Sequence, residues 1–315
     1  FNNLILVGMA FAVFWGTIFP IISEAVRGVK ITVGPPFFNQ VNVPIGLALL
    51  LLTGICPLIA WRKASQRNLR RSFTIPLSFG ILAAVALFTF GITSIYPLMS
   101  FAFSAFVLVT IIMEFYRGTM ARARISGRNV FFSLWDLTIR NKRRYGGYTV
   151  HLGVIMIFVG ITGSSAFQKE NTATMSPGST LKIAEYTLHY EKLIDQTTAH
   201  AQQVAAKIRV EKAGQEIGVL YPSKLQHKKH EPVSEVAIRQ TLKEDLYLIL
   251  AGWDEQDRAS IKALVNPLVA WIWVGGVVMI IGTLIALGPE HFRRQAETVQ
   301  AKISRRKSME VEHAA

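Results

Sequence analysis

Two residues in an otherwise apolar stretch, His151 and Gly147, have a type and spacing that suggest chemistry. They lie in RRYGGYTVHLGVIMIFVGITGSS, residues 143–165, which is long and apolar enough to span a membrane. At the rise of an α-helix, His151 would lie roughly 10 Å in from the basic cluster at residues 142–144. An ionisable side chain at that depth is costly without a partner, so His151 is a candidate functional residue.

The surroundings of His151 are compatible with two interpretations. Gly147 lies one turn before it on the same helical face, and Ile155 and Phe158 continue that face. A glycine, an imidazole and apolar bulk would suit a flat, apolar cofactor lying against the helix, with the imidazole bound to its metal. Alternatively, this face packs on another helix and the histidine donates to a neighbouring carbonyl. The residues alone leave both interpretations open.

The composition predicts a multi-pass membrane protein. Of 315 residues, 51% are hydrophobic, and the net charge is +14. The basic residues collect beside apolar spans, as the positive-inside rule expects, so we expect membrane lipid and no nucleic acid as a partner. Cys56 is the single cysteine, which excludes a disulfide or a thiolate metal site within the chain. Six spans are expected, at about residues 4–22, 43–60, 73–92, 95–115, 145–166 and 266–287.

The charged segments predict the orientation and the domains. Loops 61–72 and 116–144 and the tail 289–315 are basic, so we expect them and both termini in the cytoplasm. Residues 1–166 would form a five-span transmembrane bundle, and residues 264–288 the sixth span. Residues 167–263 carry 13 basic and 13 acidic side chains and strand-like segments, and we expect a β-rich domain on the periplasmic side. The predicted fold class is an all-α polytopic membrane protein with a small β-rich domain inserted between the fifth and sixth spans.

Five local features give further expectations. VFFSLWDLTIR, residues 130–140, suits a helix on the membrane surface, with a solvated loop as the alternative. VGPPFFN, residues 33–39, is interpreted as a rigid aromatic loop on the outer face. EVAIRQTL, residues 235–242, is predicted as a short helix, and DLYLILAGWD, residues 245–254, as the final strand. Glu114 ends the fourth span and is expected to be an interfacial counter-charge, not a proton relay.

Other motifs carry little chemistry. The outer domain holds His189, His200, His227 and His230, and the last two have i, i+3 spacing. They sit among lysines and a proline, so a solvated loop is favoured over a metal site. Nucleotide-binding and metalloprotease motifs are absent from the cytoplasmic segments, which argues against nucleotide hydrolysis.

Several long segments resemble one known family. GTIFPIISEAVRGVKITVGPPFFNQVNVPIGLALLLLTGICPLIAWR, RRYGGYTVHLGVIMIFVGITGSSAF, DLYLIL and NPLVAWIWVGG are similar, in this order, to the C-terminal half of the cytochrome c-type biogenesis proteins CcmF and NrfE. The resemblance covers nearly the whole chain, and VGPPFFN and RRYGGYTVHLG are specific to the family. It does not separate CcmF from the NrfE-type paralogue.

The resemblance implies a site and partners. The family holds a haem b in its bundle by two histidines on different spans, and His151 matches the histidine of the HLG segment. Gly147 would then pack against that haem, and the second axial ligand would lie outside this chain. The tryptophan-rich WWD loop and its two flanking histidines belong to the family's N-terminal half. Trp135–Asp136 is not that motif, because we expect it in a cytoplasmic loop.

The expected function follows from that resemblance. The chain would be the C-terminal half of a membrane haem lyase that joins haem b to apocytochrome c at the periplasmic face, with the haem b in the bundle as an electron relay. Its partners would be the N-terminal CcmF half, CcmH/CcmI-type subunits, the holo-CcmE haem chaperone and apocytochrome c, in the bacterial inner membrane. We expect a fragment or one subunit of a split protein, inactive without the WWD-containing half. A haem or solute permease and a non-catalytic assembly scaffold are the alternatives.

Overall fold

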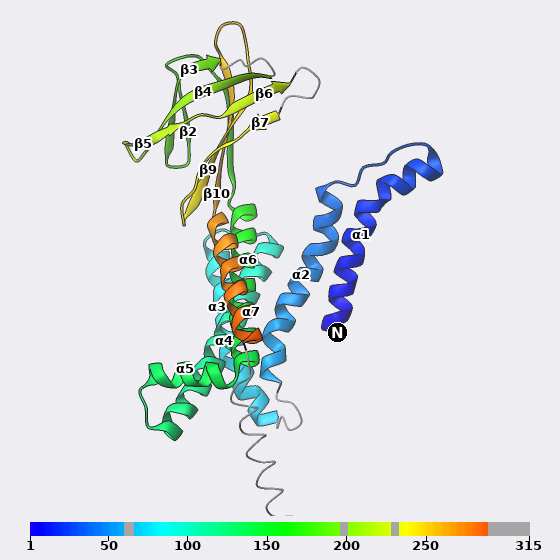
Figure 1. Cartoon of the computed structure of the whole chain (residues 1–315), viewed down its shortest axis with the longest axis vertical. Coiled ribbons are helices and arrows are strands. Elements are labelled where there is room, and N and C mark those ends of the chain that lie inside the picture. The colour runs from blue at the N-terminus through cyan, green and yellow to red at the C-terminus, as the bar shows by residue number, and fades with distance from the viewer. Residues whose placement is uncertain (60–65, 196–200, 228–232, 289–315) are drawn as a thin grey trace, which may run out of the picture. The chain divides into compact units, whose positions relative to one another are not determined.

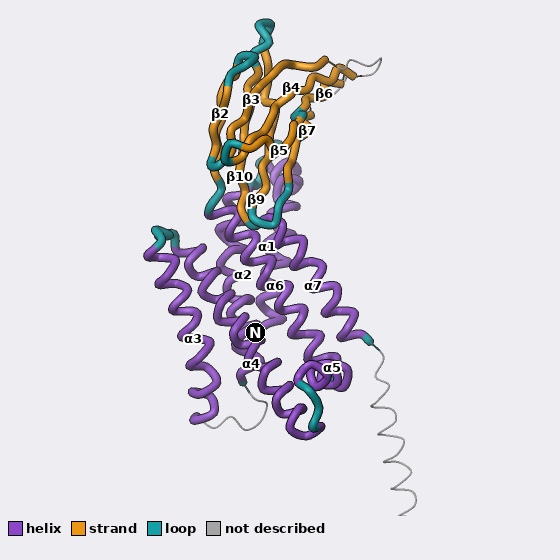
Figure 2. Tube along the Cα trace, turned by 90° about the vertical axis from the view of Figure 1, so that its left-hand side faces the viewer, coloured by secondary structure: helices purple, strands orange, loops and turns teal. Residues whose placement is uncertain are grey.

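The chain forms two compact units, one helical and one built mainly of strands (Figures 1 and 2). The computed structural model describes residues 1–59, 66–195, 201–227 and 233–288. The helical unit contains residues 1–155 and the chain from residue 275, and the second unit contains residues 156–274. Helices α6 (Lys142–Ala166) and α7 (Val269–Leu287) are each divided between the two units, after Ile155 and after Val274.

In the described part of the chain, six helices are long and apolar enough to cross a membrane. This confirms the six predicted spans and fits a multi-pass membrane protein. The six are α1 (Asn2–Arg27), α2 (Pro35–Leu58), residues 72–89 of α3 (Gln66–Thr89), α4 (Ile95–Ser126), α6 and α7.

Helix α4 is the packing centre of the helical unit. Its buried side chains Phe106 and Val107 meet α2 at Gly54, where an added Cβ would lie 2.6 Å from the ring of Phe106. On α3, a Cβ at Gly80 would lie 3.0 Å from the carbonyl oxygen of Ala102. The two glycines therefore let the neighbouring helices approach α4 closely, as is common where helices pack in membranes.

Three helices differ from the sequence-based expectation. Helix α3 begins at Gln66, inside the segment expected to be the loop of residues 61–72. The segment 33–39 is not a loop, because Pro35 opens α2. Proline suits the first turn of a helix, where its missing N–H has no intrahelical partner. Helix α4 continues to Ser126, beyond the expected end near residue 115, and stops at Gly127 with a left-handed φ of 64°. The predicted helix at residues 130–140 is confirmed as α5 (Val130–Arg140).

The second unit contains a sandwich of two antiparallel sheets (Figure 2). One sheet has the order β1 (Lys169–Met175), β10 (Ala259–Pro267), β9 (Glu244–Trp253) and β8 (Ala237–Arg239). The other has the order β2 (Thr180–Ile183), β3 (Tyr186–Asp195), β4 (Ala201–Lys212), β6 (Ser223–His227) and β7 (Val233–Glu235), and β5 (Gln215–Leu220) also pairs with β4.

The core of the sandwich follows the period of two expected of strands with one buried face. On β3 the alternate residues Tyr186, Leu188 and Tyr190 are buried, and on β9 Leu246, Leu248 and Leu250 are fully buried. These side chains and their neighbours on β4 and β10 form one hydrophobic cluster.

The second unit corrects two expectations. The predicted short helix at residues 235–242 is wrong, because this segment contains the end of β7 and the strand β8. Their backbone groups pair with β6 and β9, and this tertiary pairing overrides local helix propensity. Residues 245–254 are not the final strand either, since β10 follows and continues to Pro267, past the boundary expected at residue 263.

Candidate functional site

His151 lies near the middle of α6, in the half that belongs to the helical unit. Its side chain is half-buried, and its Nδ1 atom is buried without a hydrogen-bond partner among the described residues. It is one of five buried side-chain atoms without a hydrogen-bond partner among the described residues, and such an atom calls for an explanation such as an unseen ligand.

Glycines on α6 determine which face packs on α7. Gly146, Gly153 and Gly160 recur at every seventh residue. In the helical unit, a Cβ at Gly146 would lie 2.6 Å from the backbone nitrogen of Ala286, and one at Gly153 would lie 2.5 Å from the carbonyl oxygen of Gly275. At 3.6 residues per turn, His151 points roughly away from this stripe, so α7 does not cover it.

Gly147 is different from the glycine that precedes it. A Cβ at Gly147 would meet no atom within 4 Å in the structure. It lies four residues before His151 and hence on the same helical face. The face therefore carries an open glycine beside an imidazole whose Nδ1 has no partner within the described part of the chain, and this arrangement leaves room for a flat ligand such as a haem.

Three polar side chains hold α6 against α4 on the basic side of His151. The Nη2 atom of Arg144 lies 2.5 Å from Oε2 of Glu114, and the hydroxyl of Tyr148 donates to the same oxygen at 3.1 Å. The Nε of Arg144 donates to the Tyr148 hydroxyl at 3.1 Å. Glu114 is thus a counter-charge, as predicted, although its side chain is only 11% exposed.

Sequence analysis missed the role of Arg144 and Tyr148. Both lie on the same helical face as His151, seven and three residues before it. Their spacing, which forms a polar stripe along one face of the helix, could have indicated this role from the sequence. Among the described residues, no group of three or more metal-binding side chains is present elsewhere. The side chains of His200, His227 and His230 lie outside the described part of the chain.

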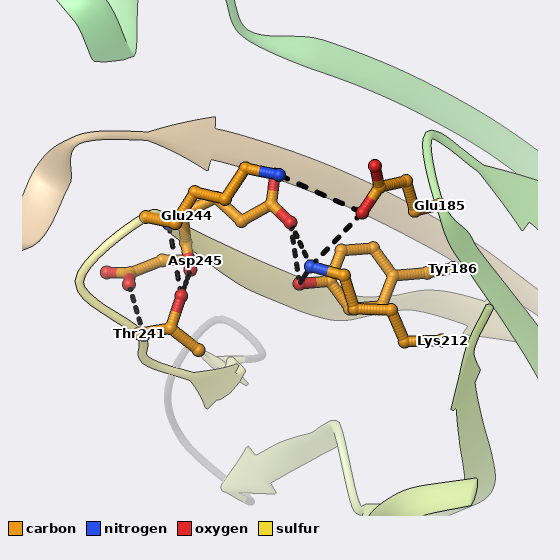
Figure 3. A network of polar contacts seen from close by, with 7 residues as sticks. Glu185, Tyr186, Lys212, Thr241, Glu244 and Asp245 are labelled. Carbon is orange, nitrogen blue, oxygen red and sulfur yellow. Dashed lines mark hydrogen bonds and ion pairs between the residues drawn. The ribbon is translucent and has the colours of Figure 1, made fainter. Parts of the chain in front are cut away.

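The sandwich holds a second polar cluster, which joins the end of β4 to the start of β3 and β9 (Figure 3). The Nζ of Lys212 lies 2.5 Å from Oε1 of Glu244 and donates to the Tyr186 hydroxyl at 3.3 Å. That hydroxyl donates to the same Glu244 oxygen at 3.0 Å, and the Lys212 ammonium lies 4.7 Å from the ring centroid.

These contacts change the pKa values of the cluster. Burial alone would raise the pKa of Glu244, but the hydrogen bonds from Lys212 and Tyr186 outweigh it and bring the pKa below its ordinary value. The bond to Glu244 raises the pKa of Lys212, and burial raises that of Tyr186. The cluster therefore contains an ammonium–carboxylate pair that is ionised at neutral pH and links the strands β3, β4 and β9.

Comparison with known proteins identifies the relatives of the chain. Residues 166–267 match the family described as the CcmF C-terminal beta-sandwich. The cytochrome c-type biogenesis protein CcmF of Pseudomonas aeruginosa is 28% identical over 94% of this chain and 44% of its own length. CcmF of Escherichia coli is 27% identical over 93% and 44%, and NrfE of Haemophilus influenzae is 24% identical over 90% and 43%.

A solved structure of the cytochrome c haem lyase CcmF has the same fold. It matches 91% of this chain and 45% of its own length, with a TM-score of 0.72 at 23% sequence identity. The resemblance to the CcmF and NrfE proteins is thereby confirmed, and this chain is similar to the C-terminal part of these cytochrome c-type biogenesis proteins. The chain spans less than half the length of the relatives that it matches.

Proposed function

We propose that this chain is the C-terminal half of a membrane haem lyase, which joins haem b covalently to apocytochrome c. Two lines of evidence support the proposal. The relatives are cytochrome c-type biogenesis proteins, and the similar solved structure is that of a cytochrome c haem lyase. The single observation that carries it within this chain is the buried Nδ1 atom of His151, which lacks a partner in the described part.

In this proposal His151 would bind the iron of a haem b inside the bundle. A neutral imidazole is a common axial ligand of haem iron. Gly147 leaves the space into which the flat ring system would fit, because a side chain there would occupy it. When bound, this haem would supply one-electron transfer that keeps the iron of the substrate haem ferrous.

The residues around His151 would orient it. Glu114, Arg144 and Tyr148 fix how α6 is rotated against α4, and the glycine stripe fixes α6 against α7 within the helical unit. A ligand held on a helix that is fixed on two sides is more precisely placed than one on a loop. The protein would thus contribute position and redox tuning, and the cofactor the chemistry.

The partners and the topology are part of the same proposal. An N-terminal CcmF half would supply the second haem ligand and the WWD loop. Holo-CcmE would deliver the substrate haem, and CcmH/CcmI-type subunits would present apocytochrome c. The β sandwich would lie in the periplasm and both termini in the cytoplasm of a bacterial cell, because the basic loops fall on one side of the spans.

The test is to co-express the N-terminal half with this chain, as wild type and as His151→Ala, and to compare reduced absorbance spectra at matched protein. We expect the variant to lose haem or to become high-spin, and added imidazole to restore part of the low-spin spectrum. His189→Ala, in the sandwich, is the matched control and should leave the spectrum unchanged. An unaltered spectrum in His151→Ala would remove the ligand assignment and favour an assembly scaffold.

A further inference from the structure

The loop between β8 and β9, residues 240–243, is fixed to the first turn of α7. The indole Nε1 of Trp271 donates to the carbonyl oxygen of Leu242 at 3.1 Å, and the backbone N–H of Leu268 donates to the carbonyl oxygen of Lys243 at 3.0 Å. All of these residues belong to the same compact unit. The loop therefore stays at the level where the apolar helix begins.

The loop is also rigid from its other side (Figure 3). Thr241 donates its hydroxyl to the carbonyl oxygen of Glu244 at 2.5 Å, and its backbone nitrogen donates to Oδ1 of Asp245 at 3.1 Å. Glu244 is held in turn by Lys212 and Tyr186. A loop bonded in this way cannot fold its tip back onto the core of the sandwich.

The tip that results is apolar and exposed. Leu242 is 70% exposed, and its hydrogen-bond partner Trp271 is partly exposed. Trp273, in the same turn of α7 as Trp271, is 72% exposed. Tryptophans at the start of a membrane span mark the headgroup region of the bilayer, where their rings are favoured. Because the carbonyl oxygen of Leu242 accepts a hydrogen bond from one of these tryptophans, the tip would lie at the depth of that region.

The charged residue next to the tip, Lys243, suits contact with lipid headgroups. The side chain of Lys243 is 73% exposed, and its Nζ lies 3.9 Å from the carboxylate of Glu185 on the β2–β3 turn. A lysine next to an inserted apolar residue can bury its methylenes and place its ammonium among lipid phosphates.

We propose that the loop of residues 240–243 is a membrane-surface anchor, which inserts Leu242 at the boundary between lipid headgroups and acyl chains. The lipid is that of the bilayer that α7 enters. The loop is bonded to Trp271 on one side and, through Glu244, to Lys212 and Tyr186 of the sandwich on the other. This contact with lipid would therefore fix the sandwich at a set height and tilt against the membrane. The proposal is independent of the haem chemistry proposed above, because it rests on the loop and α7 alone.

The test uses the full chain in nanodiscs of phosphatidylethanolamine and phosphatidylglycerol. The single cysteine is replaced by Cys56→Ser, and a nitroxide is attached at Leu242→Cys or, as the control, at Val233→Cys. Val233 lies on the edge strand β7 of the same sandwich and is 54% exposed. Electron paramagnetic resonance then measures collisions with oxygen, which concentrates in hydrocarbon, and with a neutral nickel chelate, which stays in water.

At position 242 we expect the nitroxide to collide more often with oxygen than with the chelate. At position 233 we expect the opposite. Chelate excess at position 242 would overturn the proposal, since the tip would then be in water. Suppression of both reagents at 242 would also overturn it, in favour of a covering protein. Adding Trp271→Phe should lower the oxygen-to-chelate ratio at 242, whereas Trp273→Phe should not. An unchanged ratio in Trp271→Phe would contradict the tether.

Discussion

Arg144 on α6 and Glu114 on α4 form an ion pair of 2.5 Å, two turns before His151 on the same helical face. The carboxylate is almost buried, whereas the Arg144 side chain is 58% exposed. Tyr148 adds a second bond from α6 to the same oxygen. The pair therefore sets the rotation of α6 about its axis, and with it the direction in which His151 points.

Removing either partner of this pair should destabilise the helical unit by about 1 kcal/mol, because the half-exposed guanidinium limits the electrostatic gain. Glu114→Gln and Arg144→Met each remove the same ion pair, so the double variant should be little less stable than either single variant. The measurement is a double-mutant cycle by equilibrium unfolding of the chain in mixed micelles. Strictly additive effects of the two substitutions would mean that the ion pair contributes nothing to stability.

Gly146→Ala should destabilise the chain, whereas Gly147→Ala should have little effect. At position 146 the new methyl would lie 2.6 Å from the backbone of α7, which cannot yield as a flexible side chain can. Overpacking of this kind costs about 1–3 kcal/mol. Thermal unfolding of the two variants side by side is the measurement, and equal melting temperatures would contradict the close α6–α7 contact.

A larger side chain at position 147 tests cofactor binding without a large change in stability. Gly147→Leu should leave the chain folded but reduce its haem content when it is co-expressed with the N-terminal half, since the added side chain fills the open face. Gly276→Leu on α7 is the matched control, because a Cβ there also meets nothing within 4 Å. Loss of haem in both variants, or in neither, would argue against a specific contact at position 147.

The sandwich should lose stability in acid through Glu244. The folded-state pKa of Glu244 lies below its ordinary value of 4.5, so its contribution is present above that pH and is lost as the pH falls through the folded-state pKa. Burial raises the pKa of Asp245, so the contribution of Asp245 to stability increases as the pH falls, opposite to that of Glu244. The effect of Glu244 is therefore isolated by comparing wild type with Glu244→Gln.

Hydrogen exchange of peptides from β9, corrected for the intrinsic rate at each pH, provides the measurement. At neutral pH the variant should be less stable by about 1–3 kcal/mol, the usual cost of losing a hydrogen-bonded charge partner. The difference should shrink as the pH falls below 4.5. A difference that stays constant from pH 7 to pH 3 would show that Glu244 acts only through packing.

The proposed orientation predicts the result of reporter fusions. A reporter that is active only in the periplasm should work when fused at Gly214, in the β4–β5 turn, and fail when fused at Ser65, in the first basic loop. A cytoplasmic reporter should give the opposite pattern. Activity of the periplasmic reporter at Ser65 alone would reverse the orientation and move the proposed substrate side to the other face.

The sequence alone determined the features that depend on local composition. The spans followed from the length of their apolar runs, because a bilayer requires about 20 apolar residues per helix whatever their neighbours. His151 was identified because an ionisable side chain in such a run is costly. The family resemblance rested on contiguous segments. Each of these signals can be read within one stretch of chain.

Tertiary structure alone decided which faces and edges are occupied. Gly146 and Gly147 are adjacent and identical, yet one touches the backbone of α7 and the other is open, because a turn of about 100° separates them and only the position of α7 distinguishes these directions. Residues 237–239 form a strand because β9 supplies their backbone partners. Leu242 became notable only when the fold bonded its carbonyl to Trp271, 29 residues away in sequence. Contacts between distant segments decide these properties, and no local pattern encodes them.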